Sequence, residues 1–278
     1  MDLYHRGDCR VNTMSREILI LSDLHAGGLV SISTPDYLAH REHENKSYSI
    51  GQNRIQRKLF NEWENMLDVV GNLSYTFLLG DLVDGCNPKS HNNYITMDIG
   101  DQVNMATELL SMIKCSKFIG VQGTEYHVGH DGISCDRTVV AELCRQNKKK
   151  LTFDHEVFYD IDGISFHAKH PGKFTSVRKN RPNVCLGEIR EAMDNPYMVN
   201  NFFQNEGTKI MLRGHVHYNE LLMWENTYNI YTPGWKGRDP YGIVKSNTFP
   251  ECGFTWMKVS NGRVEDIYQH TFYAEDKI

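Results

Sequence analysis

The sequence has 278 residues, of which 40% are hydrophobic, 23% charged and 11% aromatic. This composition is typical of a globular protein and excludes a disordered, collagen-like or coiled-coil chain. The net charge of −5 excludes a strongly basic surface that holds nucleic acid by charge alone, although it leaves a local basic patch open. Apolar runs such as Ile18 to Leu21 are far shorter than the roughly 20 residues of a transmembrane helix, so we expect no membrane span.

The N-terminal segment and the cysteines indicate the compartment. Residues 1 to 13 are polar and lack the apolar stretch of a signal peptide, so we expect a cytoplasmic protein. The seven cysteines contain no C-x-x-C pair and suggest no disulfide framework. The thirteen histidines, many of them near aspartates, are typical of a transition-metal enzyme.

Strands and helices alternate along the first half of the chain. We treat residues 1–13 as an extension and residues 14–278 as one domain, because no repeat or long linker divides them. Buried strands are predicted at 18–22, 76–79, 117–121, 163–167 and 209–213. Amphipathic helices are predicted at 53–70, 101–114 and 135–146. The order predicts an α/β fold, followed after residue 208 by short strands with a hairpin turn at 260–263.

Side chains that can bind metal follow each of five predicted strands. They are, in chain order, Asp23 and His25; Asp81 and Asp84; Thr124, Glu125 and His127; His167 and His170; and His215 and His217. Ligand sites of α/β sheets form at the carboxyl ends of strands, so these residues are expected to meet. Aspartate and histidine without cysteine suit Mn²⁺, Fe or Zn²⁺, and two ions about 3.5 to 4 Å apart would share a bridging carboxylate. Asp81 is the candidate bridge.

These motifs, taken together, resemble those of the calcineurin-like metallophosphoesterase family, which run D-x-H, G-D-x-x-D, G-N-H-D/E, H and G-H-x-H. The segments 22–25, 80–84 and 214–217 match three of them. The resemblance spans roughly residues 16 to 240 and implies a four-layer α/β/β/α sandwich. The sequence is similar in particular to members encoded by bacteriophages and prophages, which implies bacterial or phage-infected cytoplasm.

The resemblance also implies a ligand set for two divalent ions, with Mn²⁺ preferred over Fe or Zn²⁺. Asp23, His25, Asp81 and His217 would hold the first ion, and Asp81, His167 and His215 the second. His167 is preferred because it ends a predicted strand, and His170 is the alternative.

The third motif departs from the family pattern, because Thr124 and Glu125 replace its Asn-His pair. We favour His127 as the substituted acid or ligand, with Asp84 as its orienting partner. Thr124, Glu125 and His170 are alternatives for metal or substrate binding. A further alternative is that His127 is an ordinary loop residue.

The resemblance implies hydrolysis of a phosphomonoester or phosphodiester by a hydroxide that bridges the two ions. The expected substrate is a phosphorylated small molecule or a nucleic acid, with no membrane involved. Lys173, Arg178 and Arg181 form a basic stretch that would bind phosphate, or else a solvated charged face. A nuclease of the same fold is one alternative function, and a catalytically weakened metal-binding assembly module is another. Trp235, in the segment Thr232–Gly237, is predicted to lie in the core rather than to stack on a base.

Overall fold

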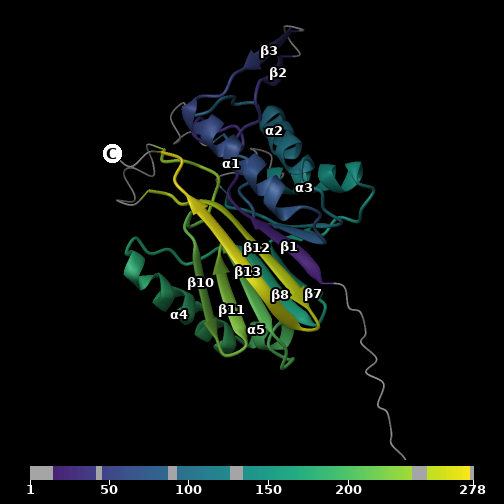
Figure 1. Ribbon diagram of the computed structural model, residues 1–278, viewed down its shortest axis with the longest axis vertical. Helices are drawn as coiled ribbons and strands as arrows, with labels where there is room; N and C mark the ends of the chain where they lie inside the picture. The colour runs from purple at the N-terminus through teal and green to yellow at the C-terminus, as the bar shows by residue number, and fades with distance from the viewer. Residues whose placement is uncertain (1–14, 42–45, 87–92, 126–133, 240–248, 276–278) are drawn as a thin grey trace, which may run out of the picture.

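The computed structural model describes residues 15–41, 46–86, 93–125, 134–239 and 249–275 (Figure 1). Two β-sheets form its centre. The first sheet has the strand order β13-β12-β1-β4-β5-β6. Its strands are β1 (Arg16–Leu21), β4 (Tyr75–Leu78), β5 (Phe118–Val121), β6 (Phe153–Asp154), β12 (Cys252–Ser260) and β13 (Arg263–Phe272). The strands β1, β4, β5 and β6 are parallel, and β12 and β13 extend the sheet with antiparallel pairing.

The second sheet has the strand order β10-β11-β9-β8-β7. Its strands are β7 (Glu156–Ile161), β8 (Ile164–Pro171), β9 (Lys209–Gly214), β10 (Glu220–Trp224) and β11 (Thr227–Tyr231). Strands β8, β9 and β11 are parallel to one another, whereas β7 and β10 pair antiparallel at the two edges. Within each sheet, the carboxyl ends of the parallel strands therefore lie along the same edge of the sheet.

The two sheets pack face to face through an apolar layer. Because side chains alternate along a strand, Ile18 and Ile20 of β1 point into this layer while Leu19 and Leu21 point to the opposite face. Phe77 of the first sheet stacks on Phe166 of the second, with ring centroids 5.2 Å apart. The buried runs of the sequence therefore form strands that are covered on both faces.

Helices cover the outer faces of both sheets. The first sheet is covered by α1 (Arg54–Val70), α2 (Ile99–Ser111) and α3 (Cys135–Gln146), and the second by α4 (Arg181–Asp194) and α5 (Pro196–Asn201) (Figure 1). Helix α1 begins where predicted, because Asn53 and Gln56 form a reciprocal capping box. The layers confirm the predicted four-layer α/β/β/α sandwich.

Two regions differ from the predicted elements. The basic stretch after β8 contains a 3₁₀ turn at Arg178–Asn180 and then helix α4, which starts with a proline in its first turn. A separate two-stranded hairpin, β2 (Tyr37–Arg41) and β3 (Lys46–Ile50), projects beyond the helical layer at the top of Figure 1. None of the helices in the described ranges has the length and apolarity of a membrane-spanning segment.

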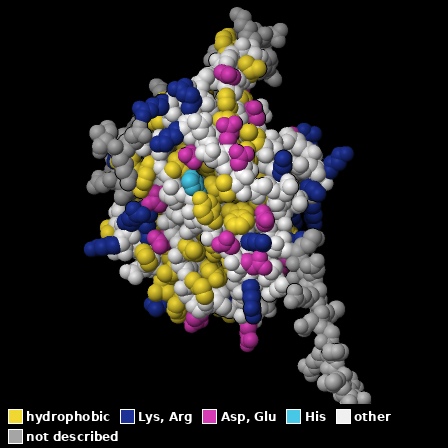
Figure 2. Space-filling model, viewed as in Figure 1, with side chains coloured by type: hydrophobic (Ala, Val, Ile, Leu, Met, Phe, Trp, Pro, Cys, Tyr) yellow, Lys and Arg dark blue, Asp and Glu magenta, His cyan; other side chains and the backbone are white. Residues whose placement is uncertain are grey.

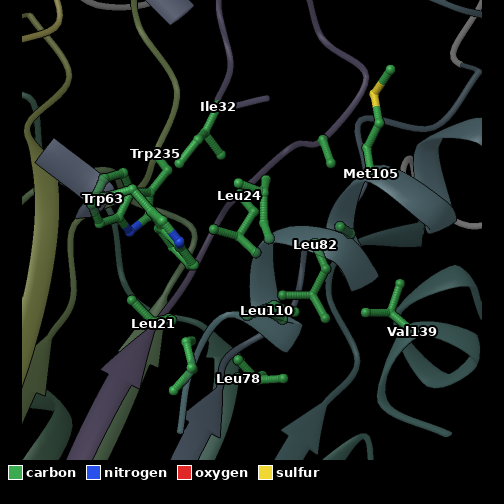
Figure 3. Close-up of a cluster of buried hydrophobic side chains, with 14 of the residues drawn as sticks. Leu21, Leu24, Ile32, Trp63, Leu78, Leu82, Met105, Leu110, Val139 and Trp235 are labelled. Carbon is green, nitrogen blue, oxygen red and sulfur yellow. The ribbon is translucent and has the colours of Figure 1, made fainter. Parts of the chain in front are cut away.

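The core beneath α1 contains the largest buried side chains. Trp63 of α1 meets Trp235 edge to face, with ring centroids 4.9 Å apart and planes at 75°, beside Leu24 and Ile32 (Figure 3). Trp235 is fully buried, which confirms its predicted place in the core and excludes it from stacking on a base. Its burial fixes the position of the backbone on either side of it.

Candidate metal centre

Six of the predicted side chains converge where the parallel strands of the two sheets end. They form two groups, Asp23 with His25 and His217, and Asp81 with His170 and His215. Within each group, one ligand atom of every residue lies within 4.8 Å of the others. The residues come from the loops after β1, β4 and β9 and from the end of β8, so segments far apart in sequence meet at one site.

Five of these six residues have left-handed backbone conformations. The φ angles are 54° at Asp23, 48° at His25, 50° at Asp81, 72° at His215 and 48° at His217. Such angles are uncommon for residues other than glycine and cost free energy, so they persist only where surrounding contacts enforce them. The loops enforce them mutually, because the Asp23 N–H donates to the Gly80 carbonyl and the His25 N–H to the Asp81 carbonyl, at 3.0 and 2.9 Å. The turns aim several ligand side chains at one point.

In the first group, three polar atoms point at one another. Asp23 Oδ1 lies 3.2 Å from His217 Nε2 and 3.7 Å from His25 Nε2, and the two Nε2 atoms are 3.3 Å apart. The other carboxylate oxygen, Oδ2, accepts hydrogen bonds from the Ser22 hydroxyl and the His215 N–H. Oδ1 is buried and accepts no hydrogen bond of good geometry from the described residues. It faces the Nε2 atoms of His217 and His25.

The second group adjoins the first through His170. His170 Nε2 lies 3.1 Å from Asp81 Oδ2 and 4.0 Å from Asp23 Oδ1. On its other side, His170 Nδ1 contacts the Leu79 carbonyl, which fixes a proton on Nδ1 and directs Nε2 into the site. Asp23 Oδ1 thus lies near members of both groups. That Asp81 bridges two ions stays a prediction.

The electrostatics of the site favour positive charge. His217 and His170 hold the pKa of the Asp23 carboxyl well below its usual range, even though burial by itself raises it. Burial by itself lowers the pKa of His170, but the carboxylates of Asp81 and Asp23 raise it to about 10. Two buried carboxylates therefore stabilise a cation at this point, whether it is an imidazolium or a metal ion.

The donor set fits divalent metal ions. It contains aspartate oxygens and imidazole nitrogens without a thiolate, the combination that Mn²⁺, Fe and Zn²⁺ accept. Asp23 Oδ1 and His170 Nε2 are buried atoms without a hydrogen bond of good geometry, and a bound cation would satisfy both. The two adjacent groups provide positions for two ions.

The preferred ligand from strand β8, His167, is on the face of the strand that points away from the site. The alternative ligand, His170, lies in the site instead. The two residues are three positions apart, so they point to opposite faces of the strand. His167 faces α4 and α5, where it stacks on Phe158 with ring centroids 4.9 Å apart. The prediction ended the strand at His167, whereas β8 continues to Pro171.

His167 belongs to a buried hydrogen-bonded chain. Its Nε2 lies 2.6 Å from Glu156 Oε1, and its Nδ1 accepts from Arg213 at 3.0 Å. Arg213 in turn pairs with Glu188 of α4. Every polar atom of the imidazole is therefore used within the protein, and the chain ties the second sheet to its covering helix.

Acidification is expected to destabilise the protein through His167. Burial and the Arg213 guanidinium lower its pKa to about 4, whereas the unfolded chain binds this proton near pH 6.5. Stability should therefore fall as the pH drops from 6.5 toward 4, by about 2 to 3 kcal/mol at pH 4.5. Urea unfolding at pH 7 and pH 4.5 measures the effect. The His167→Gln variant should lose that share of the pH dependence, and equal pH dependence in both proteins would contradict this origin.

The third motif contributes a positioning contact. The Thr124 N–H donates to Asp81 Oδ1 at 2.7 Å, and its hydroxyl lies 3.1 Å from both carboxylate oxygens. Thr124 therefore orients Asp81. Glu125 is exposed. His127 lies outside the described residues, so its proposed role as acid or ligand stays a prediction, as does its orientation by Asp84.

Among the described residues, Asp84 contacts His25 and Lys236. Its Oδ1 lies 3.0 Å from His25 Nδ1 and 2.8 Å from Lys236 Nζ. The Lys236 ammonium and the His25 contact hold the pKa of the buried Asp84 carboxyl below its usual range, against the effect of burial. Asp84 therefore orients a candidate metal ligand, and Lys236 is a site residue that sequence reasoning missed.

Asp136 is a second residue that sequence reasoning missed. It lies in the first turn of α3, buried, and accepts hydrogen bonds from the backbone N–H groups of Asp81, Leu82 and Gly123. Burial and the charge of Asp81 raise its pKa to about 6. It holds the loops after β4 and β5 together beneath the candidate ligands. The only feature of the sequence that could have pointed to Asp136 is its place in the first turn of a helix, two residues after the capping Ser134.

The predicted phosphate-binding residues are engaged in other contacts or exposed. Arg181 is buried, pairs with Glu251 at 2.8 Å and stacks on the Tyr218 ring, so it is a structural residue and the predicted phosphate contact is wrong for it. Lys173 pairs with Glu191 of α4. Arg178 is exposed in the 3₁₀ turn. On the face shown in Figure 2, Lys and Arg side chains lie mainly toward the edges, with Asp and Glu among them.

No family model matches the chain, and neither does any curated protein. Among solved structures, the chain is similar to an archaeal phosphodiesterase, with 12% identity, a TM-score of 0.46, and 92% of this chain and 99% of that chain covered. It is also similar to Vps29 from Entamoeba histolytica complexed with zinc, with 9% identity, a TM-score of 0.41, and 93% and 99% covered. A third similar structure is Yfce, a phosphoesterase from E. coli, with 11% identity, a TM-score of 0.41, and 91% and 98% covered. At such low identity, function has to be inferred from the side chains of the site.

Proposed function

We propose that this protein is a hydrolase of phosphate esters that uses two divalent metal ions. The observation that carries the proposal is the pair of adjoining Asp/His groups, with the buried Asp23 Oδ1 near members of both. Two ions about 3.5 to 4 Å apart can stabilise both the attacking and the leaving oxygen of an in-line displacement at phosphorus. The motif order in the sequence supports the same reaction.

The residues of the chain prepare this site before substrate arrives. His25 and His170 each have their Nδ1 fixed, by Asp84 and by the Leu79 carbonyl, so both present Nε2 to the site. Thr124 holds Asp81, and the His215 N–H holds Asp23. Divalent ions bound here would neutralise phosphate oxygens and lower the pKa of a bound water.

The open side of the site is marked by His215. Asp81 and His170 are buried, whereas their partner His215 is exposed. A phosphate group would therefore approach past His215. We propose Mn²⁺ as the first ion to test, with Fe and Zn²⁺ as alternatives, because the donor set contains no thiolate.

The test is metal-dependent turnover by protein that has been stripped with a chelator and then reloaded with Mn²⁺, Fe²⁺ or Zn²⁺. Substrates are nitrophenyl phosphate, bis-nitrophenyl phosphate, and labelled single- and double-stranded DNA. We expect hydrolysis that requires metal and falls at least about 100-fold in Asp81→Asn, since losing even an indirect partner of a metal ligand costs 10- to 100-fold. The preferred substrate separates a monoesterase, a diesterase and a nuclease. Two bound ions without turnover on any substrate would contradict the proposal and favour an assembly module.

A further inference from the structure

The segment Thr232–Gly237 after β11 lies against both loops that carry the first candidate metal ligands. The backbone N–H of Trp235 donates to the carbonyl of Asp23 at 2.9 Å, and the backbone N–H of Ile32 donates to the carbonyl of Trp235 at 3.0 Å. Ser31 and Lys236 form an isolated antiparallel bridge, and the Gly237 N–H donates to the Val30 carbonyl. The segment is thereby fixed to the first residue of the D-x-H motif and to the chain that follows the motif.

Successive side chains of this segment point in different directions. Trp235 enters the core against Trp63 (Figure 3). Lys236 reaches Asp84, with its Nζ 2.8 Å from Oδ1, and its side chain is 12% exposed. The buried indole anchors the segment, so the ammonium of Lys236 is held at a fixed position next to the G-D-x-x-D loop.

Lys236 pairs with two carboxylates. Its Nζ lies 2.8 Å from Asp84 and 3.0 Å from Asp239. These carboxylates offset the charge of the ammonium and face two of its three donors, and the side chain is only 12% exposed. Its contact with the site is through Asp84.

Asp84 connects Lys236 to a candidate ligand. The same oxygen, Oδ1, faces Lys236 Nζ and His25 Nδ1, the latter at 3.0 Å. The opposite ring atom, His25 Nε2, points at Asp23 and His217. A carboxylate on the remote nitrogen of a ligating histidine fixes its tautomer and its ring orientation. The buried ammonium of Lys236 fixes the Asp84 carboxylate in one position, and the carboxylate then fixes the His25 ring.

We propose that Lys236 is a positioning residue of the metal centre, which fixes Asp84 and, through it, holds the His25 imidazole with Nε2 directed into the site. This inference rests on the proposed function, because it presumes that His25 ligates an ion. The Lys236 ammonium offsets the negative charge of the buried Asp84 carboxylate. Loss of Lys236 would remove this charge pair from a buried carboxylate, which is destabilising.

The test measures metal binding rather than turnover. Mn²⁺ titration calorimetry compares the wild type with Lys236→Met, which keeps the length of the side chain without its charge, and with Lys236→Arg, which keeps the charge. Lys258→Met is the matched control, because Lys258 is half-exposed on β12 and pairs loosely with Glu265 at 3.9 Å. We expect Lys236→Met to weaken binding of one ion about 10- to 100-fold, Lys236→Arg to restore part of it, and the control to match the wild type.

A double-mutant cycle tests whether Lys236 acts through Asp84. Asp84→Asn combined with Lys236→Met removes the buried Asp84 charge together with its Lys236 partner, so it also serves if Lys236→Met alone fails to fold. The double variant should bind Mn²⁺ as Asp84→Asn does, because residues in one network are not additive. Additional weakening in the double variant, or wild-type affinity in Lys236→Met, would overturn the positioning role while leaving the proposed function intact. A wild-type protein that binds no metal would overturn both.

Discussion

Replacement of Asp23 by asparagine should remove both metal ions and reduce hydrolysis at least about 100-fold. The reason is its position, since Oδ1 is buried and lies within 4.0 Å of imidazole nitrogens from both groups. Asparagine keeps the size of the side chain but removes the negative charge that these histidines face. Metal content by mass spectrometry and turnover on nitrophenyl esters measure the result.

Two comparisons make this expectation specific. Asp160→Asn, on strand β7 and bonded to the Ser165 hydroxyl, is a matched control that should keep both ions and full activity. Asp81→Asn should reveal which carboxylate bridges, because loss of both ions would support the predicted bridge, whereas loss of one ion would restrict Asp81 to the group of His170. Asp23→Asn with two ions retained would contradict the central position assigned to Asp23.

The second large effect is a contrast between two histidines on one strand. His170→Ala should lower metal content and hydrolysis by orders of magnitude, because it removes a buried nitrogen directed at Asp81 and Asp23. His167→Ala should keep both ions and instead lower the free energy of unfolding by about 1 to 3 kcal/mol, because Glu156 and Arg213 lose a buried hydrogen-bond partner. Metal analysis and urea unfolding of both variants give the two readouts. The reverse pattern would restore His167 as the ligand.

The strand at which the sequence prediction failed shows what local patterns omit. His167 and His170 are both histidines near the end of one strand, and the sequence gives no reason for the strand to end at one rather than the other. Successive side chains of a strand point to opposite faces, so two residues three positions apart lie on opposite sides of the sheet. Only the pairing of β8 with β9, which continues to Pro171 and Gly214, shows which histidine faces the first sheet.

Charged residues were also difficult to interpret from sequence. Arg181 was grouped with Lys173 and Arg178 because they are near in sequence and share a sign. In the fold, Arg181 is buried against Glu251, a residue 70 positions away. Lys236, which had no motif of its own, instead contacts Asp84 from a distance of 152 positions. The partner of a charge is a property of the folded chain, because ion pairs form between residues that the topology brings together.

The sequence by itself determined the α/β alternation, the first helix and the order of aspartates and histidines at strand ends. These features are local, since hydrophobic periodicity, turn residues and short motifs act over a few neighbouring positions. The tertiary structure decided which face of β8 enters the site, which carboxylate lies near both ligand groups, and which buried charges hold Asp84 and Asp81 in place. Those features depend on contacts between segments far apart in the chain, and only the packing of the two sheets and their helices brings such segments within hydrogen-bonding distance.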